Sequence, residues 1–187
     1  MIELMDADDQ GSSTAARRRA GHHLDTDIAI DDAGWLDAVP GVEDLTRRAA
    51  RQALVVAGDR YRFTVSIVLG DDQTVRRLNR SWRGIDKATN VLSFPALEVA
   101  PDRGPEPEPG HPKNEPIALG DVIVARQTVL HEAAMQDKTA SDHLAHLIIH
   151  GVLHLLGYDH LDDGEADRME ALEAELLGHL GIADPYR

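Results

Sequence analysis

Three histidines, His150, His154 and His160, are spaced in a way that suits a metal ion. Side chains four residues apart on a helix lie on one face, so His150 and His154 can offer ring nitrogens to the same ion. Gly157 can reverse the chain after such a helix, and the reversal returns His160 to that face. Three neutral imidazoles leave one position of a tetrahedral ion open, where a bound water becomes more acidic. The spacing therefore predicts a catalytic metal site rather than a closed structural one.

The residue after the first histidine separates two hydrolytic chemistries. Helix-borne metalloproteases with this histidine spacing carry a glutamate there as general base, whereas this chain has Gly151. The chain has no cysteine, so nitrogen and oxygen atoms must supply every metal ligand. A protease or another metallohydrolase remains an alternative, and Gly151 disfavours it.

Three other side chains are candidates for supporting the site. His146 lies on the helix face of His150, where it would be either a partner of a ligand or, by preference, a partly buried histidine with its own hydrogen bonds. Asp159 or Asp121 could orient a ligand histidine through a hydrogen bond. The remaining histidines lack this spacing and receive no role.

Hydrophobic periodicity predicts the helix that carries the motif. Apolar residues recur every three or four positions from about Asp142 to Leu156, with Ser141 as the expected N-cap. Gly157 is placed to end this helix in a left-handed conformation. A last helix is expected from about 164 to 177.

The rest of the chain is predicted to build a sheet around this helix. Strands are expected at 26–30, 61–70, 90–95 and 117–125, and helices at 41–57, 71–82 and 128–135. This order indicates a single α/β (α+β layered) domain with a central mixed sheet and the metal site at a helix-turn. The domain is expected to span 25–187, after a disordered tail at 1–24 and with a Pro-rich loop at 101–116.

The distribution of charge limits the partners. The 187-residue chain has a net charge of −14, which argues against binding a polyanion with the whole surface. Residues 46–100 invert the balance, with ten Lys and Arg against five Asp and Glu, and leave a basic strip suited to a phosphate-bearing ligand. Neither a signal peptide nor a membrane span is apparent, so a cytoplasmic location is expected.

Three segments together carry a family resemblance. HGVLHLLGYDH at 150–160, LNRSWRGIDKATNVLSFP at 78–95 and LGDVIVA at 119–125 resemble the YbeY family of endoribonucleases, over about residues 26–187. The resemblance implies one α/β domain, one Zn²⁺ bound by the three motif histidines, and Arg83 as a further catalytic residue. It also implies cleavage of single-stranded RNA in maturation of the 16S rRNA 3′ end and in ribosome quality control. The implied partners are ribosomal RNA, the small ribosomal subunit or its proteins, and an assembly GTPase.

Arg83 has a chemical reason to belong to such a site. A guanidinium facing the metal can bind two phosphate oxygens and offset charge that grows in the transition state. The nucleophile is either a metal-bound hydroxide or the 2′-hydroxyl of the RNA, and the sequence leaves both open. For Arg83 alone, a surface salt bridge with Asp86 is the simpler interpretation. For the whole chain, the alternative is a non-catalytic, metal-stabilised ribosome assembly factor.

Overall fold

The computed structural model describes residues 24–58, 60–99, 104–112, 115–160 and 162–187. A four-stranded mixed sheet forms its centre, in the order β1-β2-β4-β3. The strands are β1 (Leu24–Ile30), β2 (Phe63–Gly70), β3 (Val91–Pro95) and β4 (Ile117–Ala125). β1, β2 and β4 run parallel and β3 is antiparallel to β4, which confirms the predicted mixed sheet.

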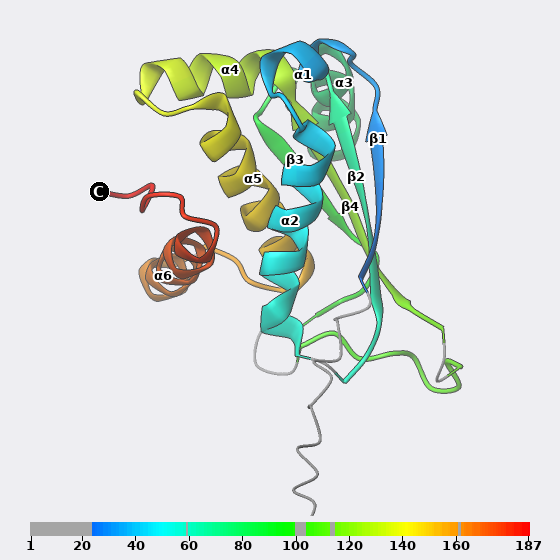
Figure 1. Cartoon of the computed structure of the whole chain (residues 1–187). Helices are drawn as coiled ribbons and strands as arrows, with labels where there is room; N and C mark the ends of the chain where they lie inside the picture. The colour runs from blue at the N-terminus through cyan, green and yellow to red at the C-terminus, as the bar shows by residue number, and fades with distance from the viewer. Residues whose placement is uncertain (1–23, 59, 100–103, 113–114, 161) are drawn as a thin grey trace, which may run out of the picture.

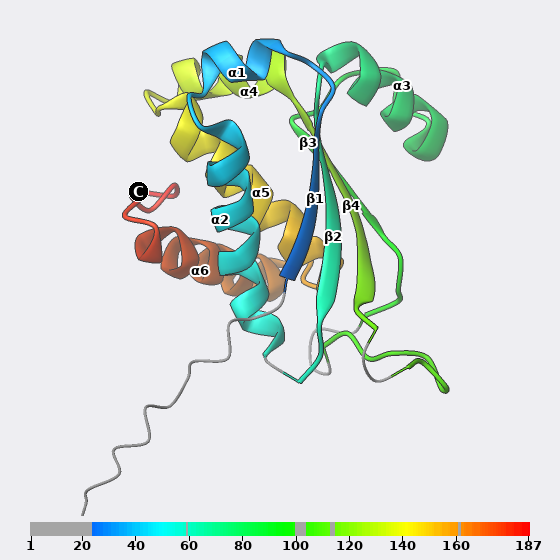
Figure 2. The same ribbon diagram turned by 45° about the vertical axis from the view of Figure 1, so that its right-hand side comes forward.

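Helices cover the two faces of the sheet unequally. They are α1 (Gly34–Ala38), α2 (Val42–Leu54), α3 (Asp72–Arg83), α4 (Arg126–Met135), α5 (Ala140–Leu155) and α6 (Asp163–His179), with a 3₁₀ turn at Val55–Ala57. α2, α5 and α6 lie on one side of the sheet, and α3 lies on the other (Figures 1 and 2). Within the part of the chain that the structure describes, no helix is both long and apolar enough to cross a bilayer.

Several predicted boundaries shift by one to three residues, and two of these shifts concern the site helix and the tail. α5 begins at Ala140 because the Thr139 side chain, not that of Ser141, accepts the hydrogen bond from Asp142 N (3.0 Å). Leu24, assigned to the tail, is the first residue of β1, and residues 1–23 lie outside the described residues. Helix α1 was not predicted, because five residues are too short to show a period. The described residues 104–112 of the Pro-rich loop form neither helix nor strand.

α5 runs through the middle of the molecule rather than over its surface. It packs against β3 and β4 on one side, α2 on another and α6 on a third. Its leucines, isoleucines and valine are therefore buried, including Leu144, Ile148 and Val152. Each such side chain contributes about 1.5–3 kcal/mol to folding by leaving water. Any polar residue of α5 must consequently find a partner inside the protein.

Gly151 is the point at which α5 comes closest to the sheet. A Cβ built there would lie 2.7 Å from Val122 Cγ1 and 3.1 Å from Ser93 Oγ, so a side chain does not fit. The Ser93 hydroxyl also donates a hydrogen bond to Gly151 O (3.0 Å). The position that holds the base in helix-borne metalloproteases thus faces the sheet in this chain, which gives a packing reason for the glycine.

Gly151→Ala should lower the free energy of unfolding by about 1–3 kcal/mol, because Val122 and Ser93 must move away from the new methyl group. Gly178→Ala, in α6, is the matched control, since a Cβ there meets nothing within 4 Å. The control should gain up to about 1 kcal/mol from its higher helix propensity. Urea denaturation measures both, and equal stabilities for the two variants would contradict the proposed close approach.

Candidate metal centre

The end of α5 and the turn after it bring the three predicted histidines together. One ring nitrogen from each of His150, His154 and His160 lies within 4.8 Å of the other two. The Nε2 atoms of His150 and His154 are 3.0 Å apart, and the ring of His160 lies 5.1 Å from that of His154. This convergence is the arrangement that the spacing predicted.

The chain reverses at Gly157 through a closed helix terminus. Gly157 N donates to His154 O (3.0 Å) and Tyr158 N donates to Leu153 O (3.1 Å), which together form a Schellman motif. Gly157 has a φ of 87°, and a Cβ there would overlap with Val99 O. The turn is therefore fixed by backbone bonds, and it places His160 beside the last turn of α5.

A buried carboxylate on α6 holds the other side of the cluster. Glu173 is 0% exposed, its Oε1 accepts a hydrogen bond from His150 Nδ1 (2.7 Å), and its Oε2 accepts one from His146 Nε2 (2.7 Å). The hydroxyl of Tyr186 donates to the same Oε2. Burial raises the pKa of Glu173, but the hydrogen bonds from His146, His150 and Tyr186 outweigh it and lower the pKa to about 2. The carboxylate is therefore ionised at neutral pH.

The protonation of the histidines suits a cation. Burial, and then the neighbouring His150 and His160, lower the pKa of His154 to about 4, so this imidazole is neutral at pH 7. His150 Nδ1 must carry the hydrogen that it shares with the ionised Glu173. In the neutral imidazole, Nε2 then presents a lone pair toward His154 and His160. Three imidazole lone pairs, with no thiolate, form a donor set that could hold a divalent transition-metal ion.

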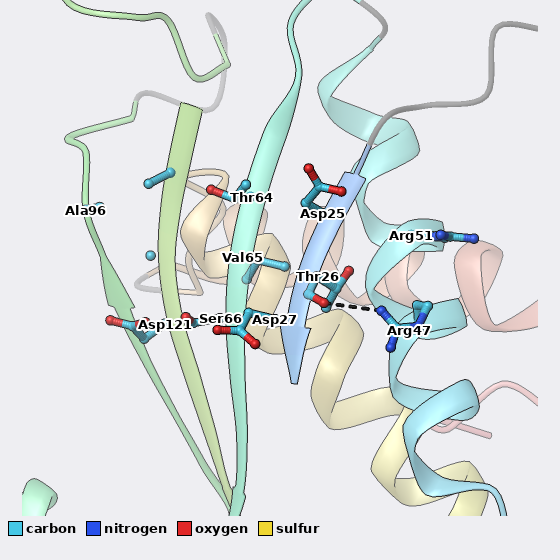
Figure 3. A pocket seen from close by; sticks show the side chains of 12 residues that line it. Asp25, Thr26, Asp27, Arg47, Arg51, Thr64, Val65, Ser66, Ala96 and Asp121 are labelled. Carbon is cyan, nitrogen blue, oxygen red and sulfur yellow. Dashed lines mark hydrogen bonds between the residues drawn. The ribbon is translucent and has the colours of Figure 1, made fainter. Parts of the chain in front are cut away.

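Neither of the two aspartates that were predicted to orient a ligand histidine forms a hydrogen bond with the ring of one. Asp121 projects from the face of β4 opposite Val122, and forms a row with the paired residues Ser66 and Asp27 in a pocket on that face (Figure 3). The sheet thus separates Asp121 from α5, and the prediction was wrong. Asp159 Oδ1 is 4.0 Å from His154 Nδ1, too far for a hydrogen bond, and accepts instead from His160 N (2.8 Å).

Sequence reasoning did not identify Glu173 or Tyr186. A signal for Glu173 exists, since it continues the apolar stripe of α6 formed by Met169, Leu176 and Leu177. A carboxylate on a buried helix face needs a donor nearby, and His146 was the unassigned donor. Tyr186 lies in the irregular segment after α6, where no sequence period indicates a contact.

Arg83 lies at the C-terminal end of α3, across the sheet from α5 (Figure 2). Among the residues that the structure describes, it makes no hydrogen bond or ion pair. The predicted salt bridge with Asp86 is wrong, because Asp86 pairs with Arg76 (2.7 Å) and lies 3.9 Å from Arg80. Arg83 thus lies on the opposite side of the sheet from the helix with His150 and His154, and its role at the metal stays a prediction.

A pocket lies beside His154, at the end of strand β3. It is lined by residues 95–99, the first of which ends β3, and by His154, Leu155 and Gly157. Phe94, the residue before this segment, lies 5.8 Å from the ring of Trp82, next to Arg83 in α3. The contact of Trp82 with Phe94 thus brings the last turn of α3 next to the strand that leads into this pocket.

Comparisons with known proteins agree with the fold and the motif. The family model described as Endoribonuclease YbeY matches residues 37–181. The chain is 48% identical to the endoribonuclease YbeY of Azorhizobium caulinodans, over 87% of this chain and 96% of that protein. It is 52% identical to the same-named protein of Parvibaculum lavamentivorans, over 87% and 85%. The solution structure of TM1509 from Thermotoga maritima has a similar fold, with a TM-score of 0.50 at 22% identity over 84% of this chain and 92% of that one.

The cluster should bind one divalent ion per chain, and Co²⁺ is a suitable spectroscopic probe. Saturating metal at 100 times its Kd should stabilise the protein by about 2.7 kcal/mol. His154→Ala should remove most of this stabilisation, because only two imidazoles would remain to bind the ion. His131→Ala, at an exposed position of α4, is the control and should keep the full effect. If the metal-dependent rise in Tm is the same in His154→Ala as in the wild type, the ion binds at another site.

Proposed function

The chain belongs to the YbeY family of endoribonucleases, and on that premise we propose that it is a Zn²⁺-dependent, single-strand-specific endoribonuclease of ribosomal RNA processing. The proposal includes maturation of the 16S rRNA 3′ end and ribosome quality control. The observation that carries it is the convergence of His150, His154 and His160 at the end of α5. Gly151 supports a nuclease over a protease, because the position of the protease base faces the sheet.

Each site residue has a proposed role that follows from its position. Zn²⁺ bound by the three histidines would polarise a phosphate oxygen and acidify a bound water. His154 is neutral at pH 7, so its imidazole keeps a lone pair that can bind the metal ion. The pocket beside it, between residues 95–99 and the turn at Gly157, offers space for the RNA backbone next to the histidines.

Positive charge is concentrated on helix α3. It carries Arg76, Arg77, Arg80 and Arg83 on a protein with a net charge of −14. Since phosphate groups concentrate where positive charge is concentrated, an RNA strand would lie along this helix. Arg83 is the arginine at the end nearest Phe94, and we assign its guanidinium to an RNA phosphate on the way to the histidines.

Trp82 fits the same path. Its side chain is 72% exposed and inclined against Phe94, so one ring face can stack with a base of a single strand. A strand held by Trp82 and Arg83 would pass around strand β3 and enter the pocket beside His154. A double helix is too stiff to follow this turn, which supports the preference for single-stranded RNA.

The acidic surface supports guided binding rather than capture of free RNA. With a net charge of −14 the chain should bind free RNA weakly and with strong dependence on salt. Proteins of the small ribosomal subunit, or an assembly GTPase, would bring the RNA to the site. This role places the protein in the cytoplasm, where ribosomes are assembled.

Arg83→Ala should lower the rate of cleavage of a labelled single-stranded 16S rRNA 3′-end fragment by about 10²–10³-fold, through loss of a phosphate-binding group. Metal content should stay unchanged, because Arg83 does not touch the histidines. His154→Ala should lose both metal and cleavage. Arg48→Ala, on α2 across the sheet, is the control and should cleave like the wild type.

The same assay separates the alternatives. If the folded, metal-bound Arg83→Ala variant cleaves RNA at the wild-type rate, the role assigned to Arg83 is wrong. No cleavage by the wild type with one ion bound, on free RNA and on small subunits alike, would instead favour the metal-stabilised assembly factor. All variants must be purified identically, so that a contaminating nuclease appears equally in each preparation.

A further inference from the structure

We infer that Glu173 and Tyr186 are positioning residues that hold His150 in the orientation needed to bind the metal ion. The inference rests on the metal site of the proposed function, and it concerns metal affinity rather than RNA cleavage. Neither residue belongs to the histidine motif, and Tyr186 lies outside residues 37–181, which the family model matches.

The first step is the geometry at His150. An imidazole can rotate and can place its hydrogen on either ring nitrogen, so a free histidine presents a metal-binding lone pair only part of the time. Glu173 Oε1 accepts from Nδ1 at 2.7 Å, which fixes both the ring and the tautomer. Nε2 is then directed at Nε2 of His154, 3.0 Å away. A carboxylate in this place also makes the imidazole a stronger ligand.

The second step is what holds the carboxylate itself. A buried anion costs several kcal/mol unless hydrogen bonds compensate for the lost water. Glu173 has such compensation on both oxygens, from His150 on Oε1 and from His146 and Tyr186 on Oε2. Loss of the Tyr186 hydroxyl would leave Oε2 with one donor and open a route for water, so the carboxylate could turn away from His150.

The third step is the anchoring of Tyr186. Lys138 Nζ donates to Pro185 O (2.9 Å), which ties the segment after α6 to the loop before α5. The Tyr186 ring lies edge-on to His146, with centroids 5.6 Å apart. The ring and hydroxyl together cover Glu173 on its outer side. The segment after α6 thus contributes to a metal site whose ligands all lie between residues 150 and 160.

A second Glu–His pair in the same protein provides the matched control. Glu132 accepts from His143 Nε2 at 2.9 Å, where His143 is buried on α5 as His150 partly is. This pair is of the same chemical type, but it has no hydrogen bond to a ligand histidine. Glu132→Gln therefore tests the cost of disturbing a Glu–His pair between α4 and α5 without disturbing the metal site.

The experiment measures the Kd for Co²⁺ by competition with a chelator, and the visible absorption of the bound ion. Tyr186→Phe, which removes only the hydroxyl, should weaken binding about tenfold, and Glu173→Gln by about 10–100-fold. Both variants should alter the Co²⁺ spectrum as His150 changes orientation. Tyr61→Phe, at a ring that packs against Phe63, and Glu132→Gln should keep the wild-type affinity and spectrum.

Each outcome decides the inference. Wild-type affinity and spectrum in folded Tyr186→Phe and Glu173→Gln would overturn it, and so would equal losses in Glu132→Gln, which would indicate general destabilisation. Tyr186→Phe keeps the test valid should Glu173→Gln fail to fold. A wild type that binds Co²⁺ but cuts no RNA would refute the proposed function while this inference stood, because the measurement uses no RNA.

Discussion

The close contact between α5 and the sheet at Gly151 is the constraint on which the site depends. With no side chain at 151, the helix lies directly on Val122 and Ser93. This contact fixes the rotation of α5 about its axis. Because successive residues are about 100° apart around a helix, the face with His150 and His154 lies to the side of the sheet contact, toward α6. Packing in the core therefore sets the direction in which His150 and His154 leave the helix. Neighbouring side chains set only the orientation of their rings.

The second constraint is electrostatic and lies across the sheet. A chain with a net charge of −14 cannot attract RNA with its whole surface, and α3 is the helix on which arginines gather. The histidines and these arginines occupy opposite sides of a sheet whose edge is β3. In the proposed function, binding and chemistry would be separated in space, and a flexible single strand could reach both by turning around that edge, which a stiff duplex could not follow.

The sequence predicted well what depends on neighbours along the chain. The histidine cluster follows from a four-residue spacing and a glycine turn, and the backbone bonds that form the turn join Gly157 and Tyr158 to the preceding helix. The partner of His150 was missed, since Asp121 and Glu173 are equally plausible until the pleat of β4 and the position of α6 are known. A shift of one residue in strand register would move every side chain of β4 to the opposite face of the sheet. Periodicity alone therefore does not determine whether Asp121 faces α5.

If it positions His150, as inferred above, the buried Glu173 would link the stability of the fold to metal binding. Its burial is unfavourable by itself, and folding compensates for it with donors from α5 and from Tyr186. On the inference drawn above, these bonds would orient His150 during folding, so that an ion would not have to order the ring, and affinity would be raised at the expense of stability. A core leucine at 173 would pack without that cost, but it would leave His150 free to rotate, and the site would then have to be assembled by the ion itself.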